Sequence, residues 1–238
     1  MLRFFISDLH LQQQRPEITR ALLYFLEQIA PGADELYLLG DIFEAWIGDD
    51  YPDPILDQIA PAFKQLKADG TAIYFLAGNR DFLLRDAGAA RLSAQLIAPP
   101  YTLRLDQGLA VVLHGDELCT QDLEYQAFRN LVRAPLWQQS FLAKPIAERL
   151  AIATELRQRS KASGASKSDA IMDVTPSAVA QLFEQTQAEL MIHGHTHRPA
   201  RHSEPAGERI VLGDWSEHGW YLRSDSQALA LVEFSPNA

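Results

Sequence analysis

The sequence predicts an α/β fold in which a largely parallel β-sheet is followed by a second sheet of mixed direction. Apolar runs typical of buried strands alternate with helical patterns through residues 2–81, and this order builds parallel sheets. After residue 100 the chain changes to short strands separated by turn residues. Residues of the metal-ligand type follow directly after five of the expected strands. Because ligands bind beyond the carboxyl ends of strands in such sheets, we expect the functional site there.

The first part of the chain supplies three strands and two helices. Leu2 to Ser7 is a strongly apolar run, typical of a buried strand. Residues 17–29 carry apolar side chains at helical spacing, and Pro31-Gly32 ends the pattern. The remaining elements are strands at 35–39 and 72–77, with a helix at 54–68 between them.

Later strands flank a helical segment. Residues 101–105 and 109–113 predict a hairpin around Asp106-Gln107-Gly108. A short apolar strand is expected at 189–192, and Arg198-Pro199 stops any regular element after it. We assign the hairpin to the second sheet together with the last expected strands, at 209–212, 220–223 and 229–234.

Residues 121–170 differ from the rest of the chain in charge. They hold eight Lys or Arg against five Asp or Glu, whereas the remainder holds 13 against 26. Helices are expected at 122–133 and from 136 to about 161, and a Ser/Gly/Lys-rich loop at 160–168. We interpret the segment as a helical lid over a site for an anionic ligand, inserted into a single domain of residues 1–238. Its apolar side chains either pack the lid on the core, or form a groove for acyl chains or an edge that rests on a membrane.

Composition narrows the function classes. A formal net charge of -10 argues against a nucleic-acid partner, which would need a basic face. The single cysteine, Cys119, excludes an internal disulfide and suits a reducing cytoplasm. The first strand follows Met1 without a signal-peptide pattern, and no apolar run approaches the ~20 residues of a membrane span. A peripheral membrane role stays open.

The expected strand ends carry the candidate site. In chain order the ligand-type residues are Asp8, His10, Asp41, Asn79, His114, His195 and His197. A glycine adjoins four of the five groups, at positions 40, 78, 115 and 194. A polar loop with buried, hydrogen-bonded histidines would explain one group alone. The gathering of such residues at five strand ends favours a metal site, since imidazole and carboxylate are common metal ligands.

Two ions fit this set of ligands. With Asp41 as the bridge, Asp8, His10 and His197 complete one ion. The other ion takes Asn79, His114 and His195. Oxygen and nitrogen ligands without thiolate suit Mn²⁺, Fe, Co²⁺ or Zn²⁺. Two ions ~3.5–4 Å apart clamp a phosphoryl group and lower the pKa of a bound water, so the implied reaction is hydrolysis at phosphorus.

The motifs together resemble those of the calcineurin-type metallophosphoesterases. They are Asp8-Leu9-His10, Gly40-Asp41, Gly78-Asn79-Arg80-Asp81, His114-Gly115-Asp116 and Gly194-His195-Thr196-His197. This resemblance implies a four-layer sandwich of two mixed β-sheets flanked by helices, with a dinuclear metal site. Within the superfamily, residues 43–50, 78–82, 170–174 and 192–199 resemble the UDP-2,3-diacylglucosamine hydrolases of Gram-negative lipid A synthesis.

That second resemblance implies a specific reaction. Water attacks the uridine-side phosphorus of UDP-2,3-diacylglucosamine and releases UMP and 2,3-diacylglucosamine 1-phosphate (lipid X). We expect two divalent ions, Mn²⁺ foremost, and a monomer at the cytoplasmic face of the inner membrane as a peripheral protein. One alternative keeps the metal site but replaces the substrate with a soluble nucleotide or a phosphoprotein. Another makes the fold a binding scaffold without activity.

Arg80 departs from the broader superfamily, in which many members have His at this position as a proton donor to the leaving group. A guanidinium stays protonated and cannot act as a general acid, but it binds phosphate oxygens in bidentate fashion. The leaving group should then need no proton. This favours cleavage of a pyrophosphate over hydrolysis of a monoester.

The resemblance also implies residue roles. The implied catalytic residues are Asp41, Asn79, Arg80, His114 and His195, and the implied substrate contacts are Asn79, Arg80, Asp122, Ser160, Lys167 and His195. Without the resemblance, Asp122 would be a helix N-cap, and Ser160 and Lys167 would be surface residues. Gly164 stands where the family commonly has Asn, so one side-chain contact to the substrate is missing.

Overall fold

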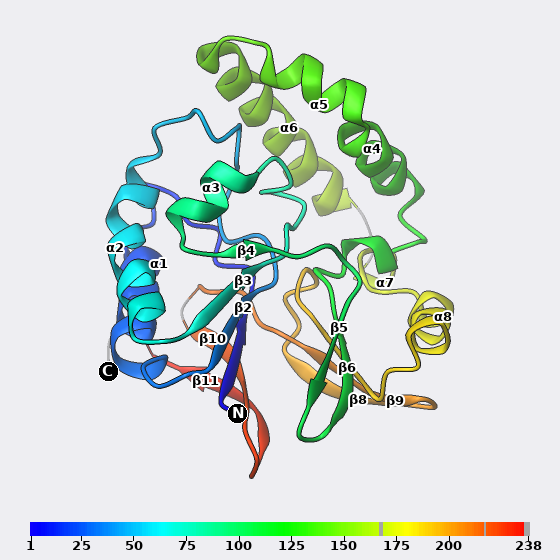
Figure 1. Ribbon diagram of the computed structural model, residues 1–238. Helices are drawn as coiled ribbons and strands as arrows, with labels where there is room; N and C mark the ends of the chain where they lie inside the picture. The colour runs from blue at the N-terminus through cyan, green and yellow to red at the C-terminus, as the bar shows by residue number, and fades with distance from the viewer. Residues whose placement is uncertain (167–168, 217, 236–238) are drawn as a thin grey trace.

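Two β-sheets pack face to face at the centre of the structure (Figure 1). The computed structural model describes residues 1–166, 169–216 and 218–235. The strands of the first sheet are β1 (Arg3–Ile6), β2 (Glu35–Leu38), β3 (Ala72–Phe75), β4 (Gln95–Leu96), β10 (Gly219–Ser224) and β11 (Leu229–Phe234). Their order across the sheet is β11-β10-β1-β2-β3-β4.

The second sheet is also mixed. Its strands are β5 (Tyr101–Leu105), β6 (Gly108–Val112), β7 (Leu190–His193), β8 (Ala200–Glu204) and β9 (Gly207–Val211), in the order β5-β6-β7-β9-β8. In the first sheet β1, β2 and β3 run parallel, and in the second β6, β7 and β9 do. The carboxyl ends of the parallel strands therefore lie along one edge of each sheet.

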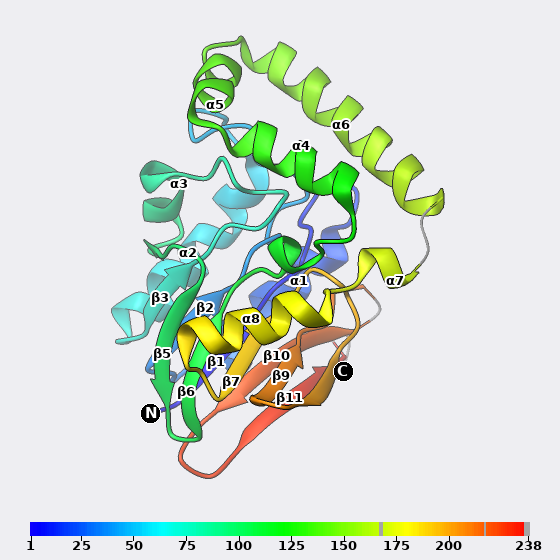
Figure 2. The same ribbon diagram turned by 90° about the vertical axis from the view of Figure 1, so that its right-hand side faces the viewer.

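Helices cover the outer faces of both sheets. Those on the first sheet are α1 (Pro16–Tyr24), α2 (Pro54–Ala68) and α3 (Asp86–Arg91). Helix α1 continues as a wider π-type turn over Phe25–Ile29. The second sheet is covered by α8 (Pro176–Thr186), as Figure 2 shows. A buried apolar cluster fills each interface: helix to first sheet, sheet to sheet, and second sheet to α8. The four-layer α/β sandwich is thus confirmed.

The helical segment stands apart from these layers, at the edge where the parallel strands end (Figures 1 and 2). It consists of α4 (Leu123–Arg133), α5 (Pro135–Leu142), α6 (Ile146–Ser166) and the short α7 (Asp169–Met172). Pro145 breaks the expected second helix into α5 and α6, since proline lacks the backbone donor that a continuous helix needs. Among the helices that the structure describes, none is long and apolar enough to cross a bilayer.

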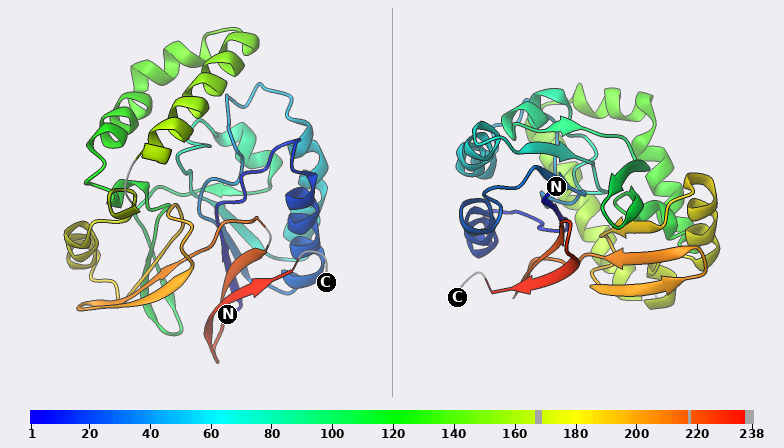
Figure 3. Two further views of the ribbon diagram at one scale, coloured as in Figure 1. Left: turned by 180° about the vertical axis from the view of Figure 1, so that it is seen from behind. Right: turned by 60° about the horizontal axis from the view of Figure 1, so that its bottom comes forward.

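Two predictions about secondary structure were wrong. The loop expected at 160–168 is helical through Ser166, where α6 ends. Strands β10 and β11 belong to the first sheet and not to the second, because β10 pairs antiparallel with β1. The alternation of apolar and polar residues fixes which face of a strand is buried, but it does not identify the neighbouring strand. Seen from behind (Figure 3), β10 and β11 extend the first sheet beside β1.

Elements with no predicted counterpart include α3, β4, α7, β8 and α8. The two residues of β4 are too few to show an apolar alternation. Strand β8 alternates between half-buried and exposed side chains at the edge of its sheet, and its residues are mostly polar. Helix α8, by contrast, buries Val179, Leu182 and Phe183 at helical spacing, a pattern that the sequence does contain.

Candidate metal centre

The strand ends bring all seven expected metal ligands together. Strand β1 leads to Asp8 and His10, β2 to Asp41 and β3 to Asn79, all from the first sheet. The second sheet contributes the three remaining histidines, His114 after β6 and His195 and His197 after β7. The carboxyl ends of the parallel strands of both sheets lie on the same side of the molecule. Residues more than 180 positions apart in the chain therefore meet there: the backbone N–H of His195 donates to Oδ2 of Asp8 at 3.0 Å.

The backbone at the site is unusual. Among the described residues other than glycine, seven have a positive φ angle. Five of these seven are expected ligands: Asp8, His10, Asp41, His195 and His197. This left-handed conformation costs an L-residue about 1–2 kcal/mol, and such strain is typically retained at functional sites. Most of this backbone strain therefore lies at the expected ligands, directly after the strands.

Glycines permit the close approach of the strand ends. A Cβ atom at Gly78 would collide with the Asp41 carboxylate, and one at Gly194 would collide with the Asp8 carboxylate. At Gly40 a Cβ would lie 2.8 Å from Nδ1 of His114. The glycines that adjoin three of the ligand groups are therefore needed for space as well as for turning the chain.

One group of donors consists of Asp8, His10 and His197. The Nε2 atoms of the two histidines lie 3.2 Å apart, and Oδ1 of Asp8 lies 3.3 Å from Nε2 of His197. Ligands that share one ion at ~2.0–2.2 Å lie ~3 Å from one another. The three side chains therefore have the mutual spacing of a metal-binding group.

The second group forms around Asn79. Its Oδ1 lies 2.9 Å from Nε2 of His114 and 2.9 Å from Nδ1 of His195. Oδ1 of Asp41 lies 3.5 Å from Nε2 of His114. Asp41 also belongs, with Asp8 and His114, to a buried set of donors within 4.8 Å of one another. Asp41 thus lies between the two groups, where a bridging carboxylate would stand.

The residues fit two divalent ions. Oδ1 of Asp8 is buried and, within the described part of the chain, makes no hydrogen bond, although it faces an imidazole. An unsatisfied buried carboxylate oxygen is costly unless a cation offsets it. The donors are carboxylate, imidazole and amide, with no thiolate among them, and this set suits divalent ions of the Mn²⁺ to Zn²⁺ series.

When no metal is bound, the surroundings shift the pKa values of His195 and His114 in opposite directions. Burial, and then the neighbouring His114, lower the pKa of His195 to about 4. Burial also disfavours a charged His114, but the carboxylates of Asp41, Asp8 and Asp116 outweigh it and raise the pKa of His114 to about 9. Burial alone would raise the pKa of Asp8, yet its contacts with His197 hold that pKa well below the usual range. The carboxylate is therefore ionised and available as a ligand at neutral pH.

Two buried aspartates that are not expected ligands form hydrogen bonds that fix the loops carrying the ligands. Asp81 is fully buried and accepts hydrogen bonds from the backbone N–H groups of Ile42, at 2.8 Å, and Gly78, at 2.7 Å. It therefore joins the ends of β2 and β3. Asp116, next to the His114 loop, accepts from the hydroxyl of Tyr125 at 2.6 Å and from Nε of Arg129 at 2.7 Å. It joins the second sheet to α4.

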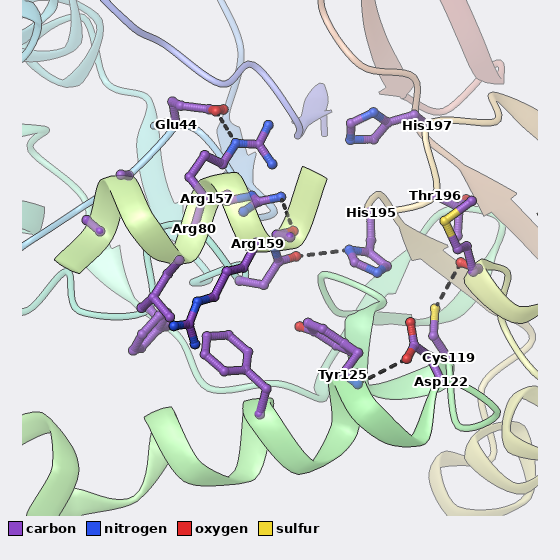
Figure 4. Close-up of a pocket in the computed structure, with 18 of the residues that line it drawn as sticks. Glu44, Arg80, Cys119, Asp122, Tyr125, Arg157, Arg159, His195, Thr196 and His197 are labelled. Atoms are coloured by element: carbon purple, nitrogen blue, oxygen red, sulfur yellow. Dashed lines mark hydrogen bonds and ion pairs between the residues drawn. The ribbon is translucent and has the colours of Figure 1, made fainter. Parts of the chain in front are cut away.

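A cavity of about 490 Å³ lies between the metal ligands and the helical segment (Figure 4). Asn79, Arg80 and His195 line its polar end. Its apolar wall is formed by Trp46, Phe82, Leu83, Phe128, Ala153 and Leu156. Four arginines, at positions 80, 157, 159 and 198, also line it, and Figure 4 labels the first three. The cavity thus combines a cationic end beside the metal ligands with an apolar wall that comes partly from the helical segment.

Two of the expected substrate contacts, Ser160 and Asp122, line the cavity. Ser160 lines the cavity, and its Oγ is 3.4 Å from Nη2 of Arg80. Asp122 lines the cavity too, but it also accepts from the backbone N–H of Tyr125 at 3.0 Å and caps α4. Asp122 is therefore the N-cap of α4, and its contact with a substrate stays a prediction. Lys167 lies outside the described residues.

Sequence reasoning gave no role to several residues of the cavity, among them Glu44, Tyr125 and Arg157. The ring of Tyr125 lies 6.0 Å from that of His195, and Glu44 is 3.3 Å from Nδ1 of His10. Glu44 lies in the segment 43–50 that carried the family resemblance, which was the one available signal. Tyr125 and Arg157 lie on α4 and α6, where residue spacing alone does not show which side chains face the cavity.

Comparisons with known proteins agree with this geometry. The calcineurin-like phosphoesterase family matches residues 1–199. A protein of Cellvibrio japonicus named UDP-2,3-diacylglucosamine hydrolase is 50% identical over 236 residues, covering 97% of this chain and 98% of its own. A protein of the same name from Aeromonas hydrophila is 50% identical over 227 residues, covering 93% of this chain and 94% of its own.

A solved structure gives independent support for the fold alone. The structure of an archaeal phosphodiesterase matches with a TM-score of 0.51 at 11% sequence identity, over 99% of each chain. Family membership follows from the family match and from the relatives at 50% identity. The chain belongs to the calcineurin-like phosphoesterases and, within them, to the family of the UDP-2,3-diacylglucosamine hydrolases.

Proposed function

We propose that the chain hydrolyses the pyrophosphate bond of UDP-2,3-diacylglucosamine and yields UMP and 2,3-diacylglucosamine 1-phosphate. The observation that carries this proposal is the single cavity in which metal-ligand side chains and an apolar wall meet. A substrate with a charged diphosphate and two acyl chains needs both surfaces at once. The names of relatives at 50% identity support the same substrate.

The polar end of the cavity suits the diphosphate. Arg80 and Arg157 supply positive charge there, and guanidinium groups bind phosphate oxygens in bidentate fashion. The backbone N–H of Arg80 donates to Oδ1 of Asp41 at 2.8 Å, which fixes the arginine beside the expected bridge. Burial lowers the pKa of Arg80 from its ordinary value, but a guanidinium remains protonated in proteins. Arg80 therefore binds charge and does not donate a proton.

Two divalent ions, which we propose to be Mn²⁺, would supply Lewis acidity and an activated water at neutral pH. We assign Asp8, His10 and His197 to one ion and Asn79, His114 and His195 to the other, with Asp41 shared. Water attacks the uridine-side phosphorus, and the sugar phosphate leaves as an anion that needs no proton. Arg80 binds the diphosphate charge while this bond breaks.

Further residues are proposed to contact the substrate. Ser160 and Asp122 line the cavity and can hydrogen-bond sugar or amide groups. Lys167 is proposed to meet phosphate charge, as the resemblance implies. The helical segment 121–170 acts in this scheme as a lid within a single domain.

The apolar wall would hold the acyl chains. Each CH₂ group that leaves water contributes about 0.8 kcal/mol, so even part of one chain would stabilise the complex appreciably. Large apolar side chains are also exposed on the outer side of α4 and α5: Leu123 at 76%, Leu131 at 56% and Leu136 at 79%. They support a peripheral contact with a membrane surface. We propose that this surface is the cytoplasmic face of the inner membrane and that the protein is a monomer.

Hydrolysis in H₂¹⁸O tests the direction of attack. The proposal predicts that UDP-2,3-diacylglucosamine gives UMP carrying the label and unlabelled 2,3-diacylglucosamine 1-phosphate, as measured by mass spectrometry. Label in the sugar phosphate would contradict attack at the uridine-side phosphorus. No cleavage at all, in a protein that binds metal, would favour a soluble nucleotide or a phosphoprotein as the substrate.

A further inference from the structure

Helix α6 is joined to one core segment, residues 43–50, by two ion pairs. Nε of Arg157 donates to Oε1 of Glu44, and Nη2 of Arg149 donates to Oδ2 of Asp50. The two arginines are eight positions apart on the helix. The ion pairs use the same chemistry, attach the same helix and reach the same core segment. They differ in what the carboxylate touches on its other side.

Glu44 touches the metal centre. Its second oxygen, Oε2, lies 3.3 Å from Nδ1 of His10, and Nε2 of the same imidazole lies 3.2 Å from Nε2 of His197. The imidazole of His10 therefore lies between a carboxylate on one side and its fellow ligand on the other. The side chains of Glu44 and His10 are only 15% and 13% exposed, so water screens their interaction weakly.

Asp50 lies away from the metal centre. Its carboxylate binds Arg149, whose Nη1 also donates to the backbone carbonyl of Ile47 at 2.7 Å. Its side chain is 61% exposed, whereas that of Arg149 is 2% exposed. Within the described part of the chain, the hydrogen bonds between Asp50, Arg149 and Ile47 involve none of the seven expected ligands. This pair attaches α6 without reaching the site.

We propose that Glu44 is a positioning residue for the metal centre and that Arg157 couples it to α6. Nδ1 of His10 is buried and makes no hydrogen bond within the described residues, and the Glu44 carboxylate 3.3 Å away is an acceptor within reach. Donation from Nδ1–H to this carboxylate would leave Nε2 free for a metal ion, the usual arrangement around metal-bound histidines. Arg157 fixes the orientation of Glu44 through its other oxygen. The position of the helix therefore affects the geometry of a metal ligand. This inference rests on the metal site assigned under the proposed function and adds a residue to it.

The coupling works in both directions. If contact with Arg157 improves the position of His10, then a metal ion on His10 must in turn favour the attached position of α6, because binding free energies are reciprocal. Arg157 also lines the cavity, so it faces the substrate and Glu44 together. Figure 4 shows Glu44 and Arg157 in contact above the cavity.

Metal affinity of the stripped protein tests the proposal. Mn²⁺ is titrated into the parent and into Glu44→Gln, Arg157→Gln and Asp50→Asn by isothermal titration calorimetry. We expect Glu44→Gln to weaken the tighter-bound ion about 10–100-fold, the usual effect of losing the partner of a metal-bound histidine. Asp50→Asn should bind Mn²⁺ as the parent does, because it loosens α6 without touching His10.

A double-mutant cycle adds the contribution of the helix. Arg157→Gln should weaken Mn²⁺ binding in the parent but have little further effect in Glu44→Gln, since its influence passes through Glu44. If Glu44→Gln does not fold, the Mn²⁺ affinities of Arg157→Gln and Asp50→Asn can still be compared, and only Arg157→Gln should bind more weakly than the parent. Unchanged affinity in Glu44→Gln, or an equal loss in Asp50→Asn, would overturn the proposal.

The readout separates this inference from the proposed substrate. If the parent binds Mn²⁺ but does not cleave UDP-2,3-diacylglucosamine, the proposed function fails and the role of Glu44 is still decided by the affinities. If the parent binds no divalent ion, both fail together. Hydrogen exchange of α6 gives a second measurement: added Mn²⁺ should slow exchange in the parent and in Asp50→Asn more than in Glu44→Gln. Equal slowing in all three would contradict the coupling.

Discussion

The Nε2 atoms of His10 and His197 lie 3.2 Å apart, although 187 positions separate the two residues in the chain. Without a metal, one ring would have to donate a hydrogen bond to the other. The buried Oδ1 of Asp8 lies beside them, 3.3 Å from His197. Two imidazole nitrogens and a carboxylate oxygen that converge in this way are best explained by a shared cation.

Replacing Asp41 with Asn should remove activity while leaving the fold intact. The amide can still accept the hydrogen bond from the backbone N–H of Arg80, now at 2.8 Å, but it loses the charge that a bridging ligand needs. We expect turnover to fall at least ~10³-fold, since the two ions would no longer be held as a pair. Circular dichroism and the melting temperature serve as controls for folding. Retained turnover in Asp41→Asn would remove Asp41 from the bridging position.

Metal binding should release a proton at neutral pH. In the metal-free protein the pKa of His114 is about 9, raised by nearby carboxylates against the opposing effect of burial. His114 is therefore protonated below this pH, and a metal ion must displace the proton. Affinity should rise with pH up to about 9, by up to ~10-fold per unit for one displaced proton.

Calorimetry in buffers of different ionisation enthalpy counts these protons. We expect a release at pH 7 that disappears at high pH, where the imidazole is already neutral. A metal-binding enthalpy that is independent of the buffer at pH 7 would show that no proton is displaced from His114.

Arg80 should bind phosphate without taking part in proton transfer. Arg80→Gln should lower kcat/KM by roughly 10²-fold, because a charged bidentate contact to the diphosphate is lost. The pH profiles of the parent and of Arg80→Gln should run parallel through the alkaline range. If the parent shows an alkaline limb that is missing in the variant, position 80 donates a proton after all.

Phe128 should contribute to binding of the acyl chains. It lines the cavity from α4, whereas Leu131 on the same helix is 56% exposed and is not among the cavity-lining residues. Phe128→Ala should raise KM for the long-chain substrate roughly 10–100-fold, as expected for losing a large apolar contact. A substrate with truncated acyl chains should be affected less. Leu131→Ala provides the control for a general loss of apolar surface on α4: because Leu131 lies outside the cavity, any change in KM should be the same for both substrates.

The ligand residues could be predicted from the sequence because they follow apolar runs directly. A buried strand ends where its apolar run ends, so Asp41 and Asn79 were placed at strand ends without knowledge of the fold. Parallel strands then bring such residues to one edge. The grouping around Asn79 agrees with the assignment of His114 and His195 to one ion. The metal-ligand roles themselves stay a proposal until binding is measured.

Partners that depend on three-dimensional packing could not be predicted. Glu44 reaches His10 only because segment 43–50 runs beside the end of β1, where Leu11 pairs with Phe43. The assignment of β10 to the first sheet likewise depends on pairing with β1, where the paired residues lie 217 to 221 positions apart along the chain. Such contacts arise from tertiary packing, and no local pattern of apolar residues encodes them.

We propose that a metal centre and an apolar cavity act together on a lipid-linked diphosphate. The most direct measurement compares hydrolysis of UDP-2,3-diacylglucosamine, UDP-glucose and a bis-aryl phosphodiester, with and without added Mn²⁺. We expect strongly Mn²⁺-dependent cleavage of the acylated substrate, with UMP as product, and little cleavage of the other two. Equal or faster cleavage of UDP-glucose or the diester would contradict the claim, because the apolar wall of the cavity would then contribute nothing to the choice of substrate.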